Sequence, residues 1–259
     1  MPHRRLKPLP RPALREFLAT ESAGGVVLLA GAIAALMWAN SPWSATYADV
    51  WGWHDLRHWI NDGLMTVFFL VVGLEVKREL TRGHLASWRA AATPALAAVG
   101  GMAVPALVYL AIAGSTAPRG WAVPMATDIA LAVAVALERG VHPWASFVVV
   151  PVFALANAGI TVTGAGLRDA FGSALTWGIV AGLVLGKPIG VLAGRAILTR
   201  DTPPRLAGIG AAAGIGFTVA LFIAELAFDD PIQHDQAKLA ILVASLLAGC
   251  LSTALLRRP

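Results

Sequence analysis

The chain has 259 residues, of which 57% are hydrophobic and 14% charged, and its formal net charge is +5. A soluble domain carries roughly a quarter charged residues, so this composition excludes an ordinary soluble protein and indicates an integral membrane protein. The positive charge does not indicate a nucleic-acid partner, because the basic residues lie in short clusters between apolar runs, where they would meet lipid headgroups. One cysteine, no Walker loop and no cluster of metal-ligating side chains predict no disulfide, no cofactor and no enzymatic activity.

The chain begins with a basic arm, residues 1–21, which contains Arg4, Arg5, Lys7, Arg11 and Arg15. The apolar run that follows, 23–39, is longer than the apolar region of a signal peptide, which has about 7–15 residues, and it does not end at small residues. We therefore expect an uncleaved first span. The chain divides into a cytoplasmic arm, 1–21, and a helical membrane transport domain, 22–259.

Runs long enough to cross a bilayer recur along the whole domain. A transmembrane helix needs about 20 mainly apolar residues, and shorter runs are tolerated in broken helices. Candidate spans lie at 22–40, 59–76, 91–113, 121–137, 144–161, 173–197, 206–228 and 237–256. The connections between them contain turn-forming Asn, Asp, Gly and Pro residues. The expected fold class is an all-α integral membrane protein with about eight transmembrane helices.

The basic residues also predict the orientation of these spans. If the N-terminus is cytoplasmic, the cytoplasmic segments hold 15 of the 20 lysines and arginines. The opposite segments hold only four, which are Arg57, Arg119, Arg168 and Lys238. This asymmetry follows the positive-inside rule and predicts that both termini are cytoplasmic.

Two charged residues, Asp128 and Lys187, lie well inside predicted spans. Charge in a span is costly and usually marks a function or a buried partner. Pro124 removes a backbone donor shortly before Asp128, and Thr127 and Asp128 can bond the freed backbone groups, which favours a broken helix. For Lys187, a structural ion pair and a side chain that extends to the interface are the alternatives to a function. Its position near the middle of the run favours a function.

Glycines mark the centre of the seventh span, where Gly214 and Gly216 lie two residues apart. Close helix packing explains many glycines in membrane helices. A second interrupted helix is the alternative, and two interrupted helices in corresponding repeats indicate an ion site. The glycines alone leave both interpretations open.

Titratable residues gather at the cytoplasmic ends of two spans. Glu75 lies one helical turn from Arg78 and Glu79, so a solvated cluster of ion pairs is the simplest interpretation. Glu138 and His142 are also one turn apart if that segment is helical. A histidine at this position could sense pH, although an ordinary interfacial histidine is the commoner case.

Several stretches, taken together and in order, resemble the NhaA-type sodium/proton antiporters. They lie at 21–25, 38–41, 59–65, 73–80, 124–130, 153–159, 186–188 and 214–218. Each is weak alone, but the ordered set is specific and covers nearly all of the chain after the basic arm.

The resemblance implies a bacterial inner-membrane protein that exchanges Na⁺ for H⁺ in pH and sodium homeostasis. It implies inverted repeats and two interrupted helices that cross near the ion site. It places Asp128, Thr127 and Lys187 at that site, with Asp128 as a ligand of Na⁺, and it places Pro124, Gly214 and Gly216 in the interruptions. It also relates five residues to the pH response: Glu75, Arg78, Glu79, Glu138 and His142. Whether Li⁺ binds and whether the chain forms a homodimer stay open.

The chain departs from this family in the middle of its sequence. The family has twelve spans, and its fifth span carries an adjacent Asp-Asp pair that is the main ion-binding site. Here residues 128–130 are followed within a few positions by 137–144, which resemble the entry to the ninth span. Four spans, ~100 residues at about 20 per span plus loops, are therefore absent. The alternative to antiport is an internally deleted, non-transporting relative.

Glu225, near the outer end of the seventh span, is a second departure, because the family usually has a small residue there. This glutamate is either a replacement carboxylate or an acid that extends to the interface, and its nearness to the interface favours the latter.

Overall fold

The computed structural model describes residues 27–82, 88–126, 144–198 and 204–257, and these residues form helices with no strand among them. Four helices are long and apolar enough to cross a membrane: Leu56–Arg78, Ala91–Ala113, Ala174–Ala196 and Pro231–Leu256. Two bent pairs meet the same criterion when both helices of a pair are counted together, Val27–Ala39 with Ser44–Gly52 and Leu206–Ala212 with Phe217–Ala227. The all-helical membrane class is confirmed, with four to six candidate spans.

The other two expected spans differ from these six. The span expected at 121–137 continues past Ala126, outside the described residues. The span expected at 144–161 is a π-helical turn, Ala145–Val149, followed by α7, Val150–Asn157. It therefore ends four residues earlier than expected. A count of eight spans stays a prediction.

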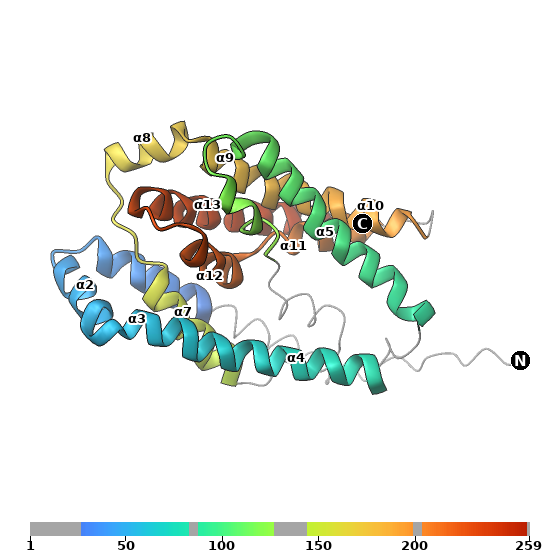
Figure 1. The fold of residues 1–259 in the computed structure, drawn as a ribbon, viewed down its shortest axis with the longest axis horizontal. Helices are drawn as coiled ribbons and strands as arrows, with labels where there is room; N and C mark the ends of the chain where they lie inside the picture. Colours follow the sequence, from blue (N-terminus) through green and yellow to red (C-terminus); the bar gives the residue numbers. More distant parts are fainter. Residues whose placement is uncertain (1–26, 83–87, 127–143, 199–203, 258–259) are drawn as a thin grey trace, which may run out of the picture.

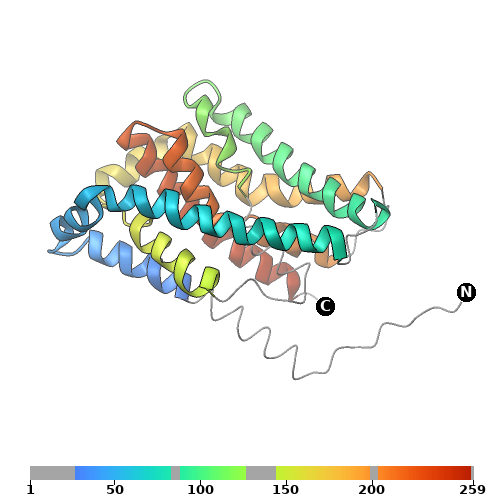
Figure 2. The same ribbon diagram turned by 60° about the horizontal axis from the view of Figure 1, so that its bottom comes forward.

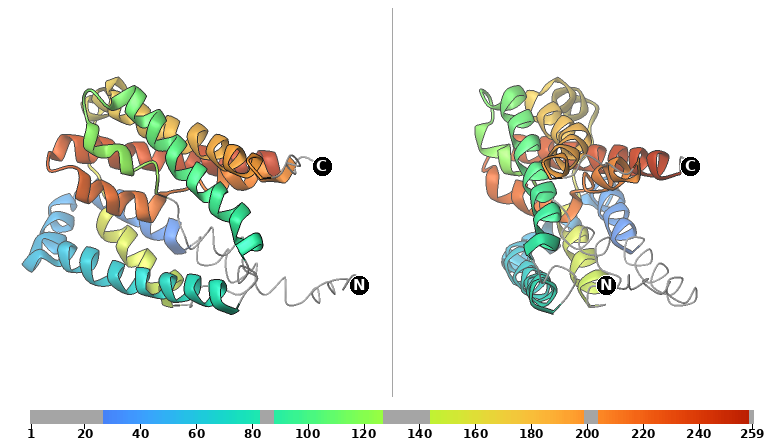
Figure 3. Two further views of the ribbon diagram at one scale, coloured as in Figure 1. Left: turned by 45° about the vertical axis from the view of Figure 1, so that its right-hand side comes forward. Right: turned by 90° about the vertical axis from the view of Figure 1, so that its right-hand side faces the viewer.

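The helices form two layers (Figures 1 and 3). One layer contains five helices: Val27–Ala39, α2 (Ser44–Gly52), α3 (Leu56–Trp59), α4 (Met65–Arg82) and α7. The other contains α5 (Trp88–Ala113), α9 (Ala174–Ala181), α10 (Lys187–Ala196), α11 (Pro204–Ala212), α12 (Phe217–Ala227) and α13 (Pro231–Leu256). The short helix α8 (Gly164–Gly172) lies at the same end of the bundle as α2 (Figure 1).

Aromatic rings join the two layers. Phe222 of α12 packs against Phe69 of α4, with ring centroids 6.1 Å apart, and against the buried Phe153 of α7, at 6.4 Å. Offset and edge-on ring pairs at these separations are favourable beyond the apolar area that they bury. The face of α12 that bears Phe222 therefore holds it against the first layer.

Backbone contact between α5 and α10 is the closest packing in the second layer, and the two helices run side by side in Figure 2. A methyl group on Gly190 would collide with the carbonyl oxygen of Gly100, and one on Gly194 with that of Leu96. Small residues let membrane helices approach this closely. The contact fixes the position of α10, the helix that begins with Lys187.

The helix α13 begins at Pro231, six residues before the expected start at 237. Asp230 caps it, because its Oδ1 accepts a hydrogen bond of 3.1 Å from the amide of Ile232, and proline is favoured in the first turn. The sequence placed Lys238 in the connection before the last span, whereas the structure places it within the helix; its side of the membrane stays a prediction. Lys238 lies inside α13, and only 3% of it is exposed.

Asn40 and Tyr47, which follow the first span, bind the backbone at the C-terminal end of α7, and we call these two residues the clamp. The Tyr47 hydroxyl lies 3.0 Å from the carbonyl oxygens of Leu155 and Ala156, and it accepts a bond of 3.2 Å from the amide of Gly159. Asn40 binds both the carbonyl of Ile160 and the amide of Val162. These bonds satisfy backbone groups that the early end of α7 leaves without helical partners.

Five of the six exposed tryptophans among the described residues lie toward one end of the bundle, and the sixth, Trp144, precedes α7. The connections near α2 and α8 and the adjoining helix ends carry five exposed tryptophans: Trp43, Trp53, Trp59, Trp121 and Trp177. The opposite ends of α4, α10 and α13 carry Arg78, Arg195 and Arg257 (Figure 1). Tryptophan at an interface and arginine at the cytoplasmic side are the usual arrangement in membrane proteins.

Candidate functional site

Three segments of the second layer depart from α-helical geometry. Residues 123–126 are non-helical and follow a short 3₁₀ helix, Pro118–Ala122. A π-helical turn, Gly182–Gly186, joins α9 to α10. Residues 213–216 separate α11 from α12, whose axes differ by 46°. Irregular backbone at membrane depth is tolerated where protein or water surrounds it, and it often marks a functional site.

These three interruptions lie against one another. A methyl group on Gly182 would lie 2.6 Å from Cβ of Pro124, and one on Gly216 would lie 3.0 Å from the carbonyl oxygen of Ala126. A methyl group on Gly214 would meet the carbonyl oxygen of Leu183. The predicted interruption residues Pro124, Gly214 and Gly216 therefore occupy one small region, and both glycines serve close backbone approach.

The ammonium of Lys187 lies in the same region. Lys187 is the first residue of α10, directly after the π-helical turn, and it is 0% exposed. Its Nζ donates a hydrogen bond of 2.6 Å to the carbonyl oxygen of Met125, in the non-helical segment 123–126. A broken helix leaves carbonyls without helical partners, and a buried cation can satisfy one of them. Because the whole side chain is buried, Lys187 does not extend to the membrane surface.

Helix ends add partial charges to this region. The N-terminal end of α12, at Phe217 and the buried Thr218, faces the break with a partial positive charge, and the C-terminal end of α11 presents a partial negative charge. The buried amine of Lys187 adds a positive charge when it is protonated. Positive charge gathered in a region of low dielectric is stabilised by a nearby carboxylate. The region is thus suited to a buried acid that can bind a small cation or a proton.

The other predicted site residues are distributed as follows. Thr127, Asp128, Glu138 and His142 lie outside the described residues. The backbone of α4 includes positions 75 and 79, but the side chains of Glu75 and Glu79 are outside the described part of the chain. Arg78 is exposed near the end of α4, in the other layer. The structure therefore brings together Pro124, Lys187, Gly214 and Gly216, and it does not bring Arg78 to them.

A buried amide pair was not predicted. Asn157, the last residue of α7, is 1% exposed, and its Nδ2 donates 2.7 Å to Oδ1 of Asn61 and 3.0 Å to the carbonyl of Phe153. Asn61 lies in a π-helical turn, Ile60–Leu64, which precedes α4. A single asparagine in the apolar run 144–161 was the available signal. Its partner, 96 residues away, could not be found from spacing.

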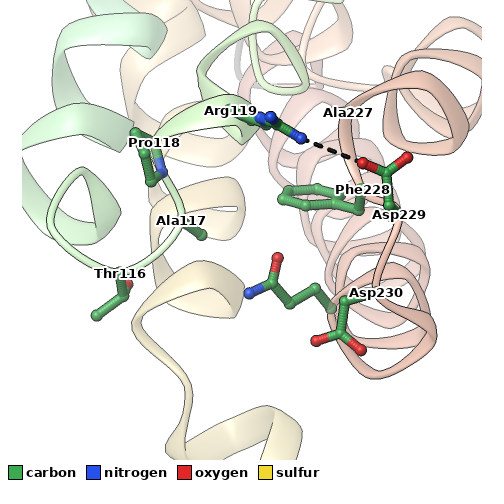
Figure 4. Close-up of a pocket in the computed structure, with 9 residues that line it drawn as sticks. Thr116, Ala117, Pro118, Arg119, Ala227, Phe228, Asp229 and Asp230 are labelled. Carbon is green, nitrogen blue, oxygen red and sulfur yellow. Dashed lines mark hydrogen bonds and ion pairs between the residues drawn. The ribbon is translucent and has the colours of Figure 1, made fainter.

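A pocket of about 280 Å³ lies elsewhere, between the start of the 3₁₀ helix and the turn before α13 (Figure 4). Its wall includes an ion pair of 3.1 Å between Arg119 and Asp229, whose side chains are both largely exposed. Exposed pairs of this kind contribute little to stability. Lys187 does not line the pocket, and Asp229 and Asp230 lie in the turn where the sequence placed them.

Apolar helices whose interruptions meet beside a buried cation are typical of membrane proteins of the secondary transporter class. Two segments of the chain, residues 15–138 and 134–256, match the model of the family described as Na+/H+ antiporter 1. The chain belongs to this family.

Curated relatives agree with this assignment. The Na(+)/H(+) antiporter NhaA of Pseudomonas entomophila is 33% identical over 390 residues, which span 97% of each chain. The NhaA of Mycolicibacterium smegmatis is 35% identical over 373 residues, spanning 93% of this chain and 86% of the relative. The NhaA 3 of Frankia alni is 31% identical over 409 residues, spanning 95% and 88%.

These alignments are longer than the chain itself. The alignment with the Pseudomonas entomophila protein has 390 positions and the chain has 259 residues, so at least 131 positions have no counterpart here. The two segments that match the family meet at residues 134–138. A segment missing between Asp128 and Glu138 accounts for both observations, and the sequence places the absent spans at the same point.

Proposed function

We propose that the chain is a multi-pass sodium/proton antiporter of the bacterial inner membrane, with both termini cytoplasmic. The observation that carries the proposal is the buried ammonium of Lys187, bound to the carbonyl of Met125 where three helix interruptions meet. The names of the curated relatives, which are Na+/H+ antiporters, support the same activity.

Asp128 is the proposed ion-binding carboxylate. It follows Ala126 by two positions, and the carbonyl of Ala126 faces Gly216 in the break between α11 and α12. A carboxylate holds either Na⁺ or H⁺, so that the arrival of one ion requires the departure of the other. The hydroxyl of Thr127 is a further oxygen ligand, and Lys187 balances the charge of the empty carboxylate. Competition at one acid is sufficient to couple the two ion flows.

The remaining assignments follow from the family. Glu75, Arg78, Glu79, Glu138 and His142 are the proposed pH-responsive residues, where protonation changes the charge at the cytoplasmic ends of spans. Na⁺ and H⁺ are the proposed transported ions, with Li⁺ as a candidate third, and lipids surround the apolar helices. A homodimer and a partly preserved inverted repeat complete the proposal.

A second candidate is a family member that no longer transports. At least 131 aligned positions of the Pseudomonas entomophila relative have no counterpart in the chain. The sequence contains one adjacent pair of aspartates, Asp229 and Asp230, and the side chain of Asp229 is 92% exposed in a turn. No intramembrane Asp-Asp pair therefore remains in the sequence. This observation favours an inactive relative over an exchanger that needs two acids.

Sodium-driven proton movement in everted membrane vesicles distinguishes the two candidates. The chain is compared with Asp128→Asn, which keeps the shape of the side chain and removes its charge. Asp229→Asn is the matched control, because it removes an exposed carboxylate from a turn. If the parent chain exchanges ions, Asp128→Asn abolishes the exchange and Asp229→Asn preserves it, then one carboxylate suffices for transport. Normal membrane insertion without exchange would refute antiport for this chain and favour the inactive relative.

A further inference from the structure

Glu225 belongs to a cluster of charged side chains that the proposed ion site does not include. Its Oε2 lies 2.6 Å from Nε2 of His234 and 3.7 Å from Nζ of Lys238, both on α13. The shorter contact places the imidazole of His234 directly against the carboxylate. The side chain of Glu225 is 27% exposed, and its partners are more buried. The carboxylate thus links α12 to α13.

The cluster extends to the first layer. The positive charge of Arg57, in α3, is close enough to attract the carboxylate of Glu225 and to repel the ammonium of Lys238. The same arginine interacts electrostatically with Tyr47 of α2. Asp235, an exposed residue of α13, acts on Lys238 as well. The carboxylate of Glu225 therefore contacts a histidine and a lysine of α13, and it lies within the electrostatic range of Arg57. It lies where the layer of α2 and α3 meets α12 and α13.

The position of Glu225 along α12 relates the cluster to the helix interruption. Thr218 is in the first turn of α12, beside the break at 213–216, and Glu225 follows it by seven residues. Seven residues are close to two full turns, so both side chains lie on one face of the helix, about 10 Å apart along its axis. A constraint on Glu225 therefore fixes the rotation of α12 and with it the direction in which Thr218 points.

We propose that Glu225 is a positioning residue, which holds the N-terminal end of α12 toward the interruptions by its contacts with His234 and Lys238 of α13. Only the expected effect of Glu225 on transport rests on the proposed antiport; the positioning of α12 does not. Glu225 does not replace the missing ion-binding acid, because its carboxylate already contacts His234 and Lys238. It is also not an acid that extends freely to the interface.

The first test measures sodium-driven exchange as a function of sodium concentration. Glu225→Gln removes the charge and keeps the size, so we expect the KM for Na⁺ to rise roughly 3- to 30-fold, with Vmax per inserted protein little changed. Glu225→Asp keeps the charge and should retain most of the affinity. Asp229→Asn, four residues away and exposed, is the control for loss of one carboxylate. A residue with a merely structural role would lower the amount of inserted protein and leave KM unchanged.

The second test needs no transport. Thr218→Cys, made with Cys250→Ser, reports the orientation of α12 through its rate of reaction with N-ethylmaleimide in membranes. Adding Glu225→Gln should increase this rate, whereas adding Glu225→Asp or Asp229→Asn should not. If the chain does not exchange ions at all, the labelling still tests the positioning role, and the two proposals fail separately.

Each outcome decides the matter. Unchanged labelling and unchanged KM in Glu225→Gln would overturn the proposal, and so would an equal effect of Asp229→Asn. If Glu225→Gln does not insert, Glu225→Gln is combined with Lys238→Met, which removes the buried cation together with its partner. A faster reaction of the Thr218→Cys thiol in that variant supports the positioning role, and an unchanged rate refutes it.

Discussion

Replacing Gly190 by alanine would place a methyl group between α10 and α5. At this position the added Cβ meets the carbonyl oxygen of Gly100 and lies 3.1 Å from Cα of Gly101. Both neighbours are backbone atoms, so no side chain can rotate away. The two helices must separate, or α10 must slide along α5.

The size of the effect follows from two opposing terms. Overpacking of a well-packed contact costs about 1–3 kcal/mol. Alanine is favoured over glycine inside a helix by about 1 kcal/mol, which offsets part of this cost. We expect a net loss of up to about 2 kcal/mol, which corresponds to a decrease of up to roughly 8 °C in Tm for a chain of this size. Exchange should also decrease, because Gly190 is one turn from Lys187.

Thermal unfolding of the purified protein in detergent measures this effect. Gly73→Ala in α4 is the matched control, because it makes the same change in a helix where a methyl group meets no atom within 4 Å. The control should keep or slightly raise Tm. If Gly190→Ala is as stable as Gly73→Ala, the close contact between α5 and α10 is refuted.

Two further substitutions test the clamp and the buried cation. Tyr47→Phe removes the hydroxyl that binds the end of α7 and the amide of Gly159, so the free energy of unfolding should decrease by about 1–3 kcal/mol, whereas Trp43→Phe, at an exposed position, should leave Tm unchanged. An unchanged Tm in Tyr47→Phe would contradict the clamp. Lys187→Met removes the cation that binds Met125 and should lower vesicle exchange at least tenfold. Lys187→Arg keeps the charge and should retain more activity. Equal exchange by the Met variant and the parent would exclude an electrostatic role for this lysine.

The long apolar elements could be predicted from composition alone. The run at 91–113 coincides with the candidate span Ala91–Ala113, and the run at 173–197 with Ala174–Ala196. Apolar residues in sufficient number require a helix across the membrane, whatever the neighbouring helices are. The glycines at 214 and 216 were open to two interpretations. The structure contains both features, a break at 213–216 and close backbone contacts there.

Shorter elements and distant contacts could not be predicted. The helix α7 ends early because Tyr47 and Asn40 satisfy the backbone after it, and both lie more than 100 residues away. The early start of α13 had a local signal, an aspartate before a proline, but hydropathy alone placed the start at 237. The buried Lys238 has its carboxylate partner, Glu225, on another helix. A hydropathy scan records none of these partners.

The five exposed tryptophans near α2 and α8 have a consequence for how deeply the protein lies in a bilayer. Indole rings at both edges of a connection resist movement into the acyl chains and into water, so they set the depth of that end. The arginines at the opposite ends of α4, α10 and α13 set the other boundary. In a bilayer thinner than the distance between these boundaries, the whole bundle must tilt or the lipid around it must thicken locally. A change in membrane thickness therefore acts on the tilt of the same helices whose interruptions surround Lys187.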